Sequence, residues 1–237
     1  MTYIILAAGK GSRLQPLTLK YAKTSFRLDE NTTVLQRMVR TIRKADKNAE
    51  IVVVIGYKAD DVKAELDGEN VKFVMNPFYE VTNSISSVWF ARDYLERENV
   101  TIVHGDIVLS DEIVKSYLVQ PTDYPYVLAD SSLDNPGAYN IVAKGDQVLA
   151  MSKKLEHYSA QYCCMTKLDP VSSRLLKEEI DDMICDNMYD QYFEDSLVQM
   201  IMFHDFQLLY EDIAGMKWSE VDTVDDLLTA QEIHRGY

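Results

Sequence analysis

Residues 4–23, which read IILAAGKGSRLQPLTLKYAK, decide the fold of this chain. They join a short apolar run, residues 3–8, to a loop that holds Gly9 and Gly11. A buried strand that ends in a glycine loop places backbone N–H groups at the rim of a sheet, where a polyphosphate can bind them. The stretch also carries four cationic side chains, Lys10, Arg13, Lys20 and Lys23. The sequence therefore predicts a phosphate-binding loop.

Two common phosphate-binding motifs do not fit the spacing of this loop. A dinucleotide-binding fingerprint needs a third glycine, and Leu14 stands at that position. A P-loop needs Gly-Lys followed directly by Ser or Thr, whereas Lys10 is followed by Gly11 and only then by Ser12. The spacing disfavours a dehydrogenase and a P-loop NTPase.

The pattern that remains is LAAGxGxRLxPLT over residues 6–18, followed five residues later by Lys23. This pattern resembles the signature of the nucleotidyltransferases that load a nucleoside monophosphate onto a phosphorylated sugar or alcohol. The family usually has Pro-Lys at the lysine, and this chain has Ala22 before Lys23. The substitution removes a rigid turn and keeps the lysine, so it bears on loop geometry rather than on chemistry.

Composition and charge limit the class of protein. A chain of 237 residues with 47% hydrophobic residues suits one large α/β domain with a sizeable core. The net charge of −14 argues against nucleic acid as a partner. Residues 1–58 nevertheless carry a balance of +7, against −21 for residues 59–237, so cations gather near the glycine loop. That distribution would attract a small anionic ligand, although Arg37, Arg40, Arg43, Lys44 and Lys47 also fit a solvated basic helix.

The expected location is the cytoplasm, without membrane insertion. No apolar run approaches the roughly 20 residues that span a bilayer, and no cleavable signal pattern follows Met1. Cys163, Cys164 and Cys185 show neither a disulfide framework nor a Cys-x-x-Cys spacing, so we expect reduced, partly buried thiols and no zinc site. The sequence leaves open whether the protein forms a homo-oligomer.

Strand-like and helix-like segments alternate in the first half of the chain. We expect strands at residues 3–8, 51–55, 71–75 and 100–104, a helix capped by Thr33, a helix with Val62 and Leu66 inward, and a helix that runs from residue 84 through Tyr94. Further strands are expected at residues 124–129, 139–143, 148–151 and 160–165, with a hairpin turn at residues 144–147. Helices are expected at residues 170–184 and 192–203, and at the C-terminus.

This order predicts an α/β protein with a Rossmann-like, three-layer α/β/α architecture and a mostly parallel mixed sheet. The resemblance implies the same fold, that of the nucleotide-diphospho-sugar transferases. We expect one domain over residues 1–237: a nucleotide-binding part at 1–129, an acceptor-binding part at 130–215, and a metal-ligand segment with the C-terminal helix at 216–237.

Polar residues follow the carboxyl ends of the expected strands, where ligands of such sheets bind. Gly56 and Tyr57 follow the second strand, Asn76 the third, and Gly105 the fourth. The segment TNS at residues 82–84 has two interpretations: Asn83 or Ser84 contacts the nucleotide, or the segment only caps a helix. By resemblance, the nucleotide-binding residues are Leu6, Ala7, Ala8, Gly9, Gly11, Ser12, Gly56, Tyr57, Asn76, Asn83, Ser84 and Gly105.

Three carboxylates are candidate magnesium ligands. Asp106 lies just past the fourth strand, at a position expected to be a solvent-facing rim, and alternation puts Glu220 and Asp222 on one face of an extended segment. Mg²⁺ prefers oxygen ligands and commonly uses one or two carboxylates together with substrate phosphates. The alternative is that Glu220 and Asp222 only precede a capped helix. The resemblance assigns Mg²⁺ to the same positions.

The resemblance also implies the reaction, in which an acceptor phosphate attacks the α-phosphorus of a nucleoside triphosphate and pyrophosphate leaves. The nucleophile is already an anion, so positioning and electrostatics supply nearly all the catalysis. In this reaction Arg13 would meet the leaving pyrophosphate, and Lys23 would bridge the α-phosphate and the acceptor phosphate. A place in the synthesis of cell-surface polysaccharide or lipid precursors is implied as well.

The acceptor is less clearly indicated. Hexose-1-phosphate members usually carry Glu-Lys-Pro after the middle strands, and this chain has Ser152 and Lys153 near that position. The chain looks more like the bacterial choline-phosphate cytidylyltransferases and their relatives for aminoethylphosphonate or phosphoglutamine, which implies CTP as the nucleotide. Aromatic and acidic side chains could bind an amine-bearing acceptor: Tyr189, Asp190, Tyr192, Asp195 and Trp218.

Two alternatives stay open. One is a uridylyl-, thymidylyl- or guanylyltransferase for a hexose 1-phosphate. The other is a regulatory subunit of the same fold that binds nucleotide without turnover, which the presence of Lys23, Asp106 and Asp222 disfavours.

Overall fold

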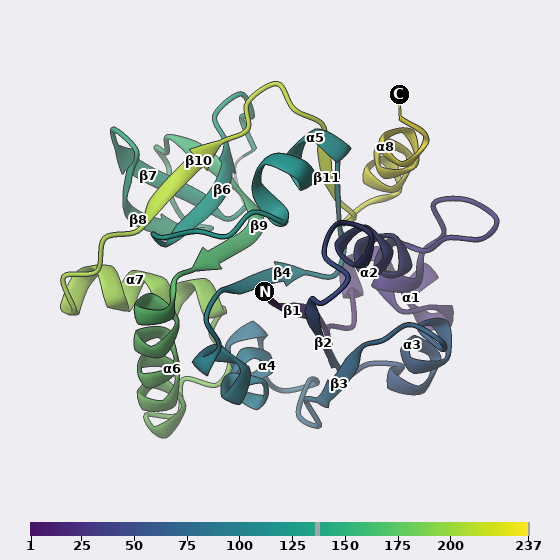
Figure 1. Cartoon of the computed structure of the whole chain (residues 1–237), viewed down its shortest axis with the longest axis horizontal. Helices are drawn as coiled ribbons and strands as arrows, with labels where there is room; N and C mark the ends of the chain where they lie inside the picture. The colour runs from purple at the N-terminus through teal and green to yellow at the C-terminus, as the bar shows by residue number, and fades with distance from the viewer. Residues whose placement is uncertain (136–137, 237) are drawn as a thin grey trace.

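The computed structural model describes residues 1–135 and 138–236. Its main feature is a nine-stranded mixed sheet in the order β3-β2-β1-β4-β9-β6-β10-β8-β7 (Figure 1). The strands are β1 (Thr2–Ala7), β2 (Glu50–Ile55), β3 (Lys72–Met75), β4 (Val100–His104), β6 (Tyr126–Asp130), β7 (Asn140–Lys144), β8 (Gln147–Ser152), β9 (Ala160–Leu168) and β10 (Leu209–Asp212). A separate two-stranded sheet pairs β5 (Ile107–Leu109) with β11 (Trp218–Glu220).

The first four strands of the sheet are parallel, as their order in the sequence predicts. β1 lies between β2 and β4, and Ile5 is level with Val53 on one side and Val103 on the other. Both faces of β1 and β2 are buried, which explains their unbroken apolar sequences. β9 then pairs antiparallel with both β4 and β6, so the sheet is parallel around the glycine loop and mixed beyond it.

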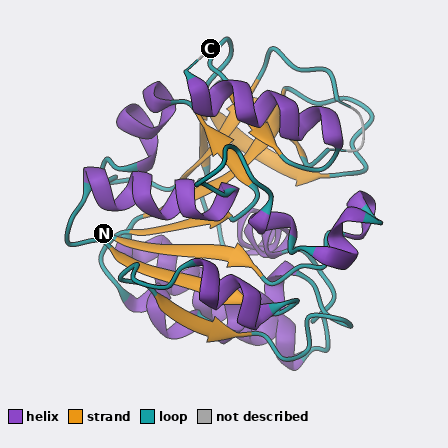
Figure 2. Ribbon diagram, turned by 90° about the vertical axis from the view of Figure 1, so that its right-hand side faces the viewer, coloured by secondary structure: helices purple, strands orange, loops and turns teal. Residues whose placement is uncertain are grey.

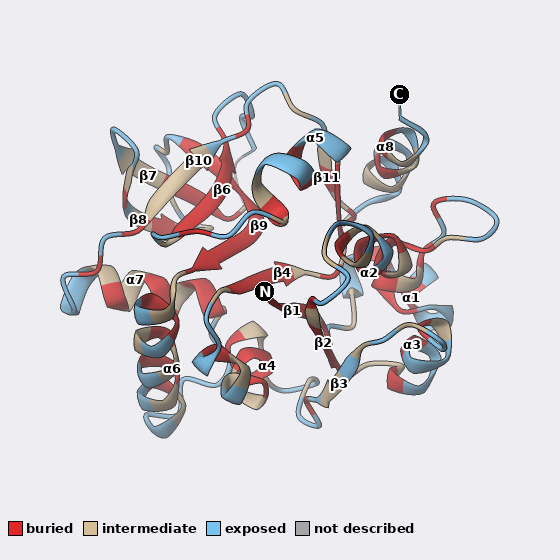
Figure 3. Cartoon of the chain, in the orientation of Figure 1, coloured by how far each residue is buried: buried red, intermediate tan, exposed pale blue. Residues whose placement is uncertain are grey.

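Helices lie on both sides of the strands in Figure 2, and Figure 3 shows most of the central strands in red as buried. One group packs together, α4 (Ser84–Phe90), α6 (Pro170–Cys185) and α7 (Phe193–Phe203), and α2 (Val34–Ala45) packs near β5 and the segment η4 (Val114–Leu118). Thr33 and Gln36 form a capping box at the start of α2, so the expected cap is confirmed. The α-helices are α1 (Leu17–Lys20), α2 (Val34–Ala45), α3 (Ala59–Glu65), α4 (Ser84–Phe90), α5 (Asp111–Ile113), α6 (Pro170–Cys185), α7 (Phe193–Phe203) and α8 (Val224–Arg235). The short helical segments are η1 (Ser12–Leu14), η2 (Lys23–Ser25), η3 (Arg92–Glu96) and the π-helical η4 (Val114–Leu118).

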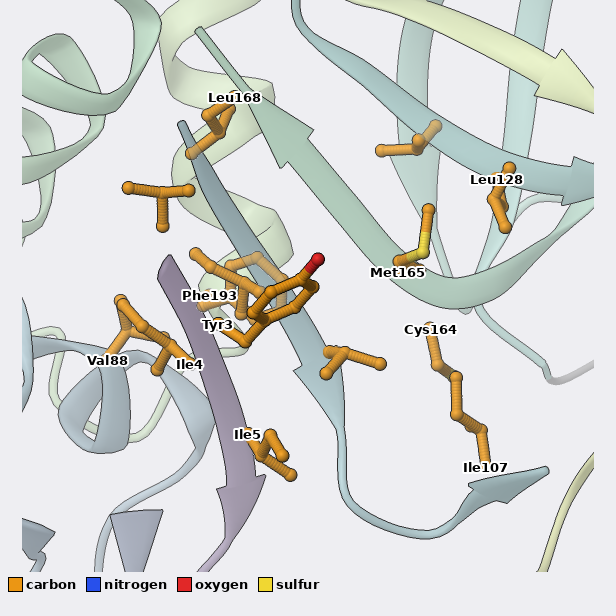
Figure 4. Packing of buried hydrophobic residues seen from close by; sticks show 14 of the residues in the cluster. Tyr3, Ile4, Ile5, Val88, Ile107, Leu128, Cys164, Met165, Leu168 and Phe193 are labelled. Atoms are coloured by element: carbon orange, nitrogen blue, oxygen red, sulfur yellow. The ribbon is translucent and has the colours of Figure 1, made fainter. Parts of the chain in front are cut away.

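One large hydrophobic cluster runs through the parallel and mixed parts of the sheet. Ile4 of β1, Val88 of α4, Met165 of β9 and Phe193 of α7 all belong to it (Figure 4). A smaller cluster connects the glycine-loop region to the C-terminal helix, with Leu14 and Phe26 on one side and Val221 and Ile233 on the other. Figure 1 shows α8 in yellow beside β11. The end of the chain is therefore packed against its beginning.

Several expectations differ from the structure in detail. The helix after Asn83 ends at Phe90, and Tyr94 lies in the 3-10 segment η3. Arg37 on the basic helix is buried rather than solvated.

Among the described residues Cys163, Cys164 and Cys185 are free thiols, the first two buried and the third exposed. The described part of the chain contains no helix that is long and apolar enough to cross a membrane.

A buried lysine fastens η4 to the sheet. Lys167 of β9 is fully buried, and its Nζ donates hydrogen bonds to the carbonyls of Tyr117, at 2.6 Å, Leu118, at 3.0 Å, and Gln120. These carbonyls lie at the end of η4, where a helix leaves acceptors without partners. Burial lowers the pKa of Lys167 to about 7.

We expect Lys167→Met to lower the free energy of unfolding at pH 9.5 by roughly 2–4 kcal/mol, because buried carbonyls at and after the end of η4 lose their hydrogen-bond donor. Urea unfolding followed by circular dichroism measures this change. Lys115→Met, at an exposed lysine within η4, is the matched control and should change stability by less than about 0.5 kcal/mol. An equal effect of the two substitutions would contradict the structural role of Lys167.

The same lysine predicts a pH dependence. Its folded pKa of about 7 lies below the value of about 10.4 for an unperturbed lysine, so the unfolded chain binds more protons between these values. Stability should therefore rise with pH from about 7 to 10 by this contribution, which Lys167→Met removes. The difference in unfolding free energy between the two proteins, measured at pH 7 and pH 9.5, tests the sign.

Candidate active site

The glycine loop leaves β1 at the carboxyl edge of the parallel strands. Gly11 adopts the left-handed region at φ 61°, and a Cβ there would stand 3.0 Å from the side chain of Lys23. Thr18 donates a hydrogen bond to the Gly11 carbonyl at 3.0 Å, which closes the loop around the lysine. The glycine is needed both for the turn and for the close approach of Lys23.

Three of the predicted nucleotide-binding residues brace this loop from neighbouring strand ends and do not line the cavity beside it. The Tyr57 N–H donates to the Ala8 carbonyl at 3.0 Å, and the Gly105 N–H donates to the Leu6 carbonyl at 2.8 Å. A Cβ on Gly56 would come within 2.8 Å of the Ala8 oxygen. Gly56, Tyr57 and Gly105 therefore hold the loop in position.

The loop forms one wall of a cavity of about 350 Å³, which we name the glycine-loop pocket. Nine predicted nucleotide-binding residues line it: Leu6, Ala7, Ala8, Gly9, Gly11, Ser12, Asn76, Asn83 and Ser84. The pocket also contains Arg13, Lys23, Asp106, Glu220 and Asp222, which come from three distant parts of the chain. The structure thus brings together the predicted phosphate-binding loop and the predicted metal ligands.

Some of the lining polar groups have structural partners of their own. The Asn76 side chain is buried and bonds to Thr82, Ser87 and the Phe78 N–H. Asn83 caps α4 through the Ser84 N–H, and the Ser84 hydroxyl accepts a hydrogen bond from the Phe193 N–H at 2.9 Å. Both interpretations of residues 82–84 are compatible with this arrangement, since the cap itself lies in the wall of the pocket.

Lys23 forms the centre of the charged cluster. Its Nζ lies 2.6 Å from an oxygen of Asp106 and also contacts Asp222, while Arg13 reaches the second oxygen of Asp222 at 2.5 Å. The Lys23 side chain is only 10% exposed and that of Asp106 only 16%. Asp106 is therefore largely buried in the wall of the pocket and does not lie at a solvent-facing rim as expected.

Burial and charge shift the pKa values in this cluster in opposite directions. Burial alone would lower the pKa of Lys23, but the charges of Asp106, Glu220 and Asp222 outweigh it and raise that pKa. Burial raises the pKa of Glu220, and the nearby Asp106 charge raises it further. Burial would also raise the pKa of Asp106, yet the ion pair with Lys23 holds it below the usual value.

The three predicted metal ligands fit a divalent cation. Asp106, Glu220 and Asp222 each offer a carboxylate oxygen, and these atoms lie within 4.8 Å of one another. One Asp106 oxygen, Oδ1, is buried without a hydrogen-bond partner in the described part of the chain. Hard oxygen donors of this kind suit Mg²⁺.

His104, Cys164 and Glu220 also lie together, which spacing in the sequence could not reveal. Burial raises the pKa of the Cys164 thiol well above its usual range, so in the absence of a metal the thiol stays protonated. His104 instead bonds to Glu194 at 3.0 Å. Burial alone would lower the pKa of His104, but this carboxylate outweighs it and raises the pKa to about 9.

A second cavity, of about 510 Å³, adjoins the first, and we name it the aromatic pocket. Tyr139, Tyr162, Tyr192 and Trp218 line it. Six residues line both cavities and form the wall that they share: Arg13, His104, Lys153, Tyr192, Glu220 and Asp222. The charged cluster therefore lies where the two cavities meet.

The predicted acceptor-binding residues divide into two groups. Tyr192 and Trp218 line the aromatic pocket. Tyr189 and Asp190 are exposed in the turn before α7 and line neither cavity, and Asp195 lies behind the wall, where Tyr139 and the Tyr192 N–H bond to its carboxylate. Sequence reasoning missed His104, Glu194 and Lys153, because their positions depend on contacts between distant segments.

An α/β fold with a glycine loop and two cavities that meet at a cluster of carboxylates and cations is the arrangement expected of a nucleotidyltransferase. The comparison with protein families agrees: residues 3–161 match the MobA-like NTP transferase domain. The chain belongs to this family of nucleotidyltransferases, as the motif at residues 6–18 indicates.

Two curated relatives extend the likeness beyond residue 161. The chain is 27% identical over 254 residues to the CTP:phosphoglutamine cytidylyltransferase of Campylobacter jejuni, which covers 96% of this chain and 98% of the relative. It is 28% identical over 246 residues to the bifunctional IPC transferase and DIPP synthase of Rubrobacter xylanophilus, with 98% of this chain and 52% of the relative covered. The chain thus spans about half of that bifunctional protein.

Solved structures show the same fold. The CTP:phosphocholine cytidylyltransferase of Streptococcus pneumoniae superposes with a TM-score of 0.81 at 18% identity and covers 98% of both chains. The inositol-1-phosphate CTP transferase of T. maritima superposes with a TM-score of 0.78 at 18% identity, with coverage of 99% of this chain and 96% of that one. The expected nucleotide-diphospho-sugar transferase fold is confirmed.

Gly9 offers a direct test of the glycine-loop pocket. A Cβ on Gly9 meets nothing within 4 Å and would project into open space, in contrast to one on Gly56. We expect Gly9→Ala to change the free energy of unfolding by less than about 0.5 kcal/mol, yet to raise the Kd of a nucleoside triphosphate at least tenfold, about 1.4 kcal/mol. Calorimetric titration and urea unfolding measure the two quantities. Unchanged binding would contradict the placement of the nucleotide against this loop.

Proposed function

We propose that the protein transfers CMP from CTP to a small phosphorylated acceptor of the phosphocholine, aminoethylphosphonate or phosphoglutamine type and releases pyrophosphate. One observation carries this proposal: the glycine-loop pocket and the aromatic pocket meet at a wall that holds Arg13, Glu220 and Asp222. CTP is supported by the names of relatives of similar length and fold, which act on CTP.

The reaction needs little proton transfer. An oxygen of the acceptor phosphate forms a bond to the α-phosphorus of CTP, the bond from that phosphorus to the bridging oxygen breaks, and pyrophosphate leaves with the electron pair. Several anions must approach in line, so positioned cations and backbone N–H groups provide most of the catalysis. Loop N–H groups near Gly9, Gly11 and Ser12 would bind the triphosphate.

Arg13 and Lys23 supply positive charge in this scheme. The Arg13 side chain is 65% exposed at the mouth of the shared wall, where it would meet the leaving pyrophosphate. Lys23 is buried beside the carboxylates, and a raised pKa keeps it charged, as its place between two phosphates requires. Their present contacts with Asp222 neutralise that carboxylate.

Mg²⁺ would be held by Asp106, Asp222 and Glu220. When bound, it would neutralise charge on the triphosphate and on the leaving group. The protein's own residues then have two separate tasks, since the carboxylates hold the cation and Lys23 and Arg13 hold phosphate oxygens.

The aromatic pocket is the candidate acceptor site. Its tyrosine and tryptophan rings, together with Glu194, suit an amine-bearing group more than a hexose, because aromatic faces and a carboxylate attract a cation. Lys153 stands in the shared wall, where it would attract the acceptor phosphate toward the nucleotide.

Pyrophosphate release with magnesium tests the proposal directly. We expect turnover with CTP and at least one of phosphocholine, aminoethylphosphonate and phosphoglutamine, and much less with UTP, dTTP or GTP and glucose 1-phosphate. Preference for UTP or dTTP with the hexose phosphate would contradict the acceptor assignment. Nucleotide binding without any release would favour the regulatory alternative.

Substitutions of the charged cluster test the roles of its residues. We expect Asp106→Asn, Asp222→Asn and Lys23→Ala each to lower kcat at least about a hundredfold, because each removes a charge that faces the reacting phosphates. The exposed hairpin residue Asp146 provides a matched control, and Asp146→Asn should leave kcat within about twofold. Circular dichroism checks that all four variants are folded. Near-normal rates of the two cluster Asn variants at saturating magnesium would overturn the metal assignment.

A further inference from the structure

Gln161 and Glu194 both line the aromatic pocket with a buried side-chain oxygen that has no partner among the described residues, and the charged one of the two is Glu194. It lies in the first turn of α7, is only 1% exposed and lines the cavity. Its Oε1 bonds to His104 Nε2 at 3.0 Å. Its other oxygen, Oε2, is buried and has no hydrogen-bond partner within residues 1–135 and 138–236. A buried carboxylate oxygen without a partner is costly, so a ligand that supplies a donor would be favoured.

Three aromatic side chains of the pocket have hydrogen-bond partners outside it. The Tyr139 hydroxyl donates to Asp195 at 2.8 Å, and the Trp218 indole N–H donates to Asp130 at 2.9 Å. The Tyr162 hydroxyl bonds to Thr166 at 2.9 Å. These side chains therefore present their rings to a ligand. A ring binds a cation whether or not the cation has hydrogen atoms on nitrogen, whereas Glu194 Oε2 needs an N–H or O–H group.

We propose that Glu194 selects acceptors that carry at least one N–H bond on the group bound in the aromatic pocket, a protonated amine or a carboxamide, over acceptors with a fully methylated ammonium group. This inference rests on the proposed function and deepens it, because it names the chemistry that separates one small phosphorylated acceptor from another. A trimethylammonium group would satisfy the rings but would leave Oε2 buried without a donor. A site built to hydrogen-bond a ligand rejects an analogue that lacks the donor more strongly than an apolar site rejects a missing methyl group.

The molecule offers a matched control for Glu194. Glu179 of α6 is also buried and also bonds to a histidine, His204, at 2.8 Å, but it lines neither cavity. A substitution there removes a carboxylate from the same kind of pair without changing the aromatic pocket.

The decisive experiment measures kcat/KM with CTP for four acceptors: aminoethyl phosphate and its N-methyl, N,N-dimethyl and N,N,N-trimethyl derivatives. The first three keep an N–H bond when protonated, and the fourth, phosphocholine, does not. We expect a drop of at least about tenfold between the dimethyl and trimethyl acceptors, larger than either earlier step. A gradual decline would indicate steric exclusion instead, and equal or better use of phosphocholine would overturn the inference.

Two variants test whether Glu194 causes the drop in kcat/KM between the dimethyl and trimethyl acceptors. We expect Glu194→Met to bring the dimethyl-to-trimethyl ratio close to one, while Glu179→Met leaves the wild-type ratio unchanged. Glu194→Gln keeps an acceptor oxygen and should retain part of the preference, so it serves as the second variant if Glu194→Met does not fold. A wild-type ratio in both Glu194 variants would refute the role of this residue.

A separate experiment tests an acceptor that carries a carboxamide. Turnover of phosphoglutamine that falls at least about tenfold in Glu194→Met, with an unchanged KM for CTP, would support the carboxamide as the group bound at Oε2. If no acceptor gives pyrophosphate release, the proposed function fails. The Kd values of the dimethyl and trimethyl acceptors for wild type and for Glu194→Met, measured by calorimetry, then still test the inference. If CTP-dependent turnover occurs and no step at the last methyl group is seen, the inference alone fails.

Discussion

The contact of Lys23 with Asp106 and Asp222 is the constraint on which the rest of the site depends. It joins the glycine loop, the end of β4 and the segment after β11, which are separated by most of the chain. One buried cation faces three carboxylates when Glu220 is counted, so removing it would leave like charges close together. Only a fold that packs the C-terminal segment against the first loop can form this cluster.

The pairing of β5 with β11 makes that packing possible. Glu220 lies opposite Ile107, next to Asp106, and the Val221 N–H donates to the Asp106 carbonyl at 2.9 Å. The smaller hydrophobic cluster, with Leu14 near the glycine loop and Ile233 in α8, supports the same junction. We infer that stability of the C-terminal helix and geometry of the charged cluster are coupled, although they lie far from each other in the sequence.

The sequence predicts the local parts of this design well. The apolar run of β1, the glycine loop, the cap at Thr33 and the β7–β8 hairpin are set by neighbouring residues, and they match the structure. The β5–β11 pair and the burial of Arg37 were not predicted, because short strands and buried cations depend on partners more than 70 residues away. The resemblance to the family identified the three carboxylates, but it did not predict that Asp106 is largely buried.

The start of α7 shows why acceptor recognition is the hardest feature to predict. Asp195, which the sequence offers as a ligand residue, caps its own helix and binds Tyr139, so both of its oxygens have partners. Its neighbour Glu194 lines the aromatic pocket, where His104 bonds to one of its oxygens and the second has no partner among the described residues. Adjacent acidic residues thus have opposite tasks, and the phase of one helical turn decides between them. Both side chains are carboxylates, so the sequence alone does not show which of them lines the pocket.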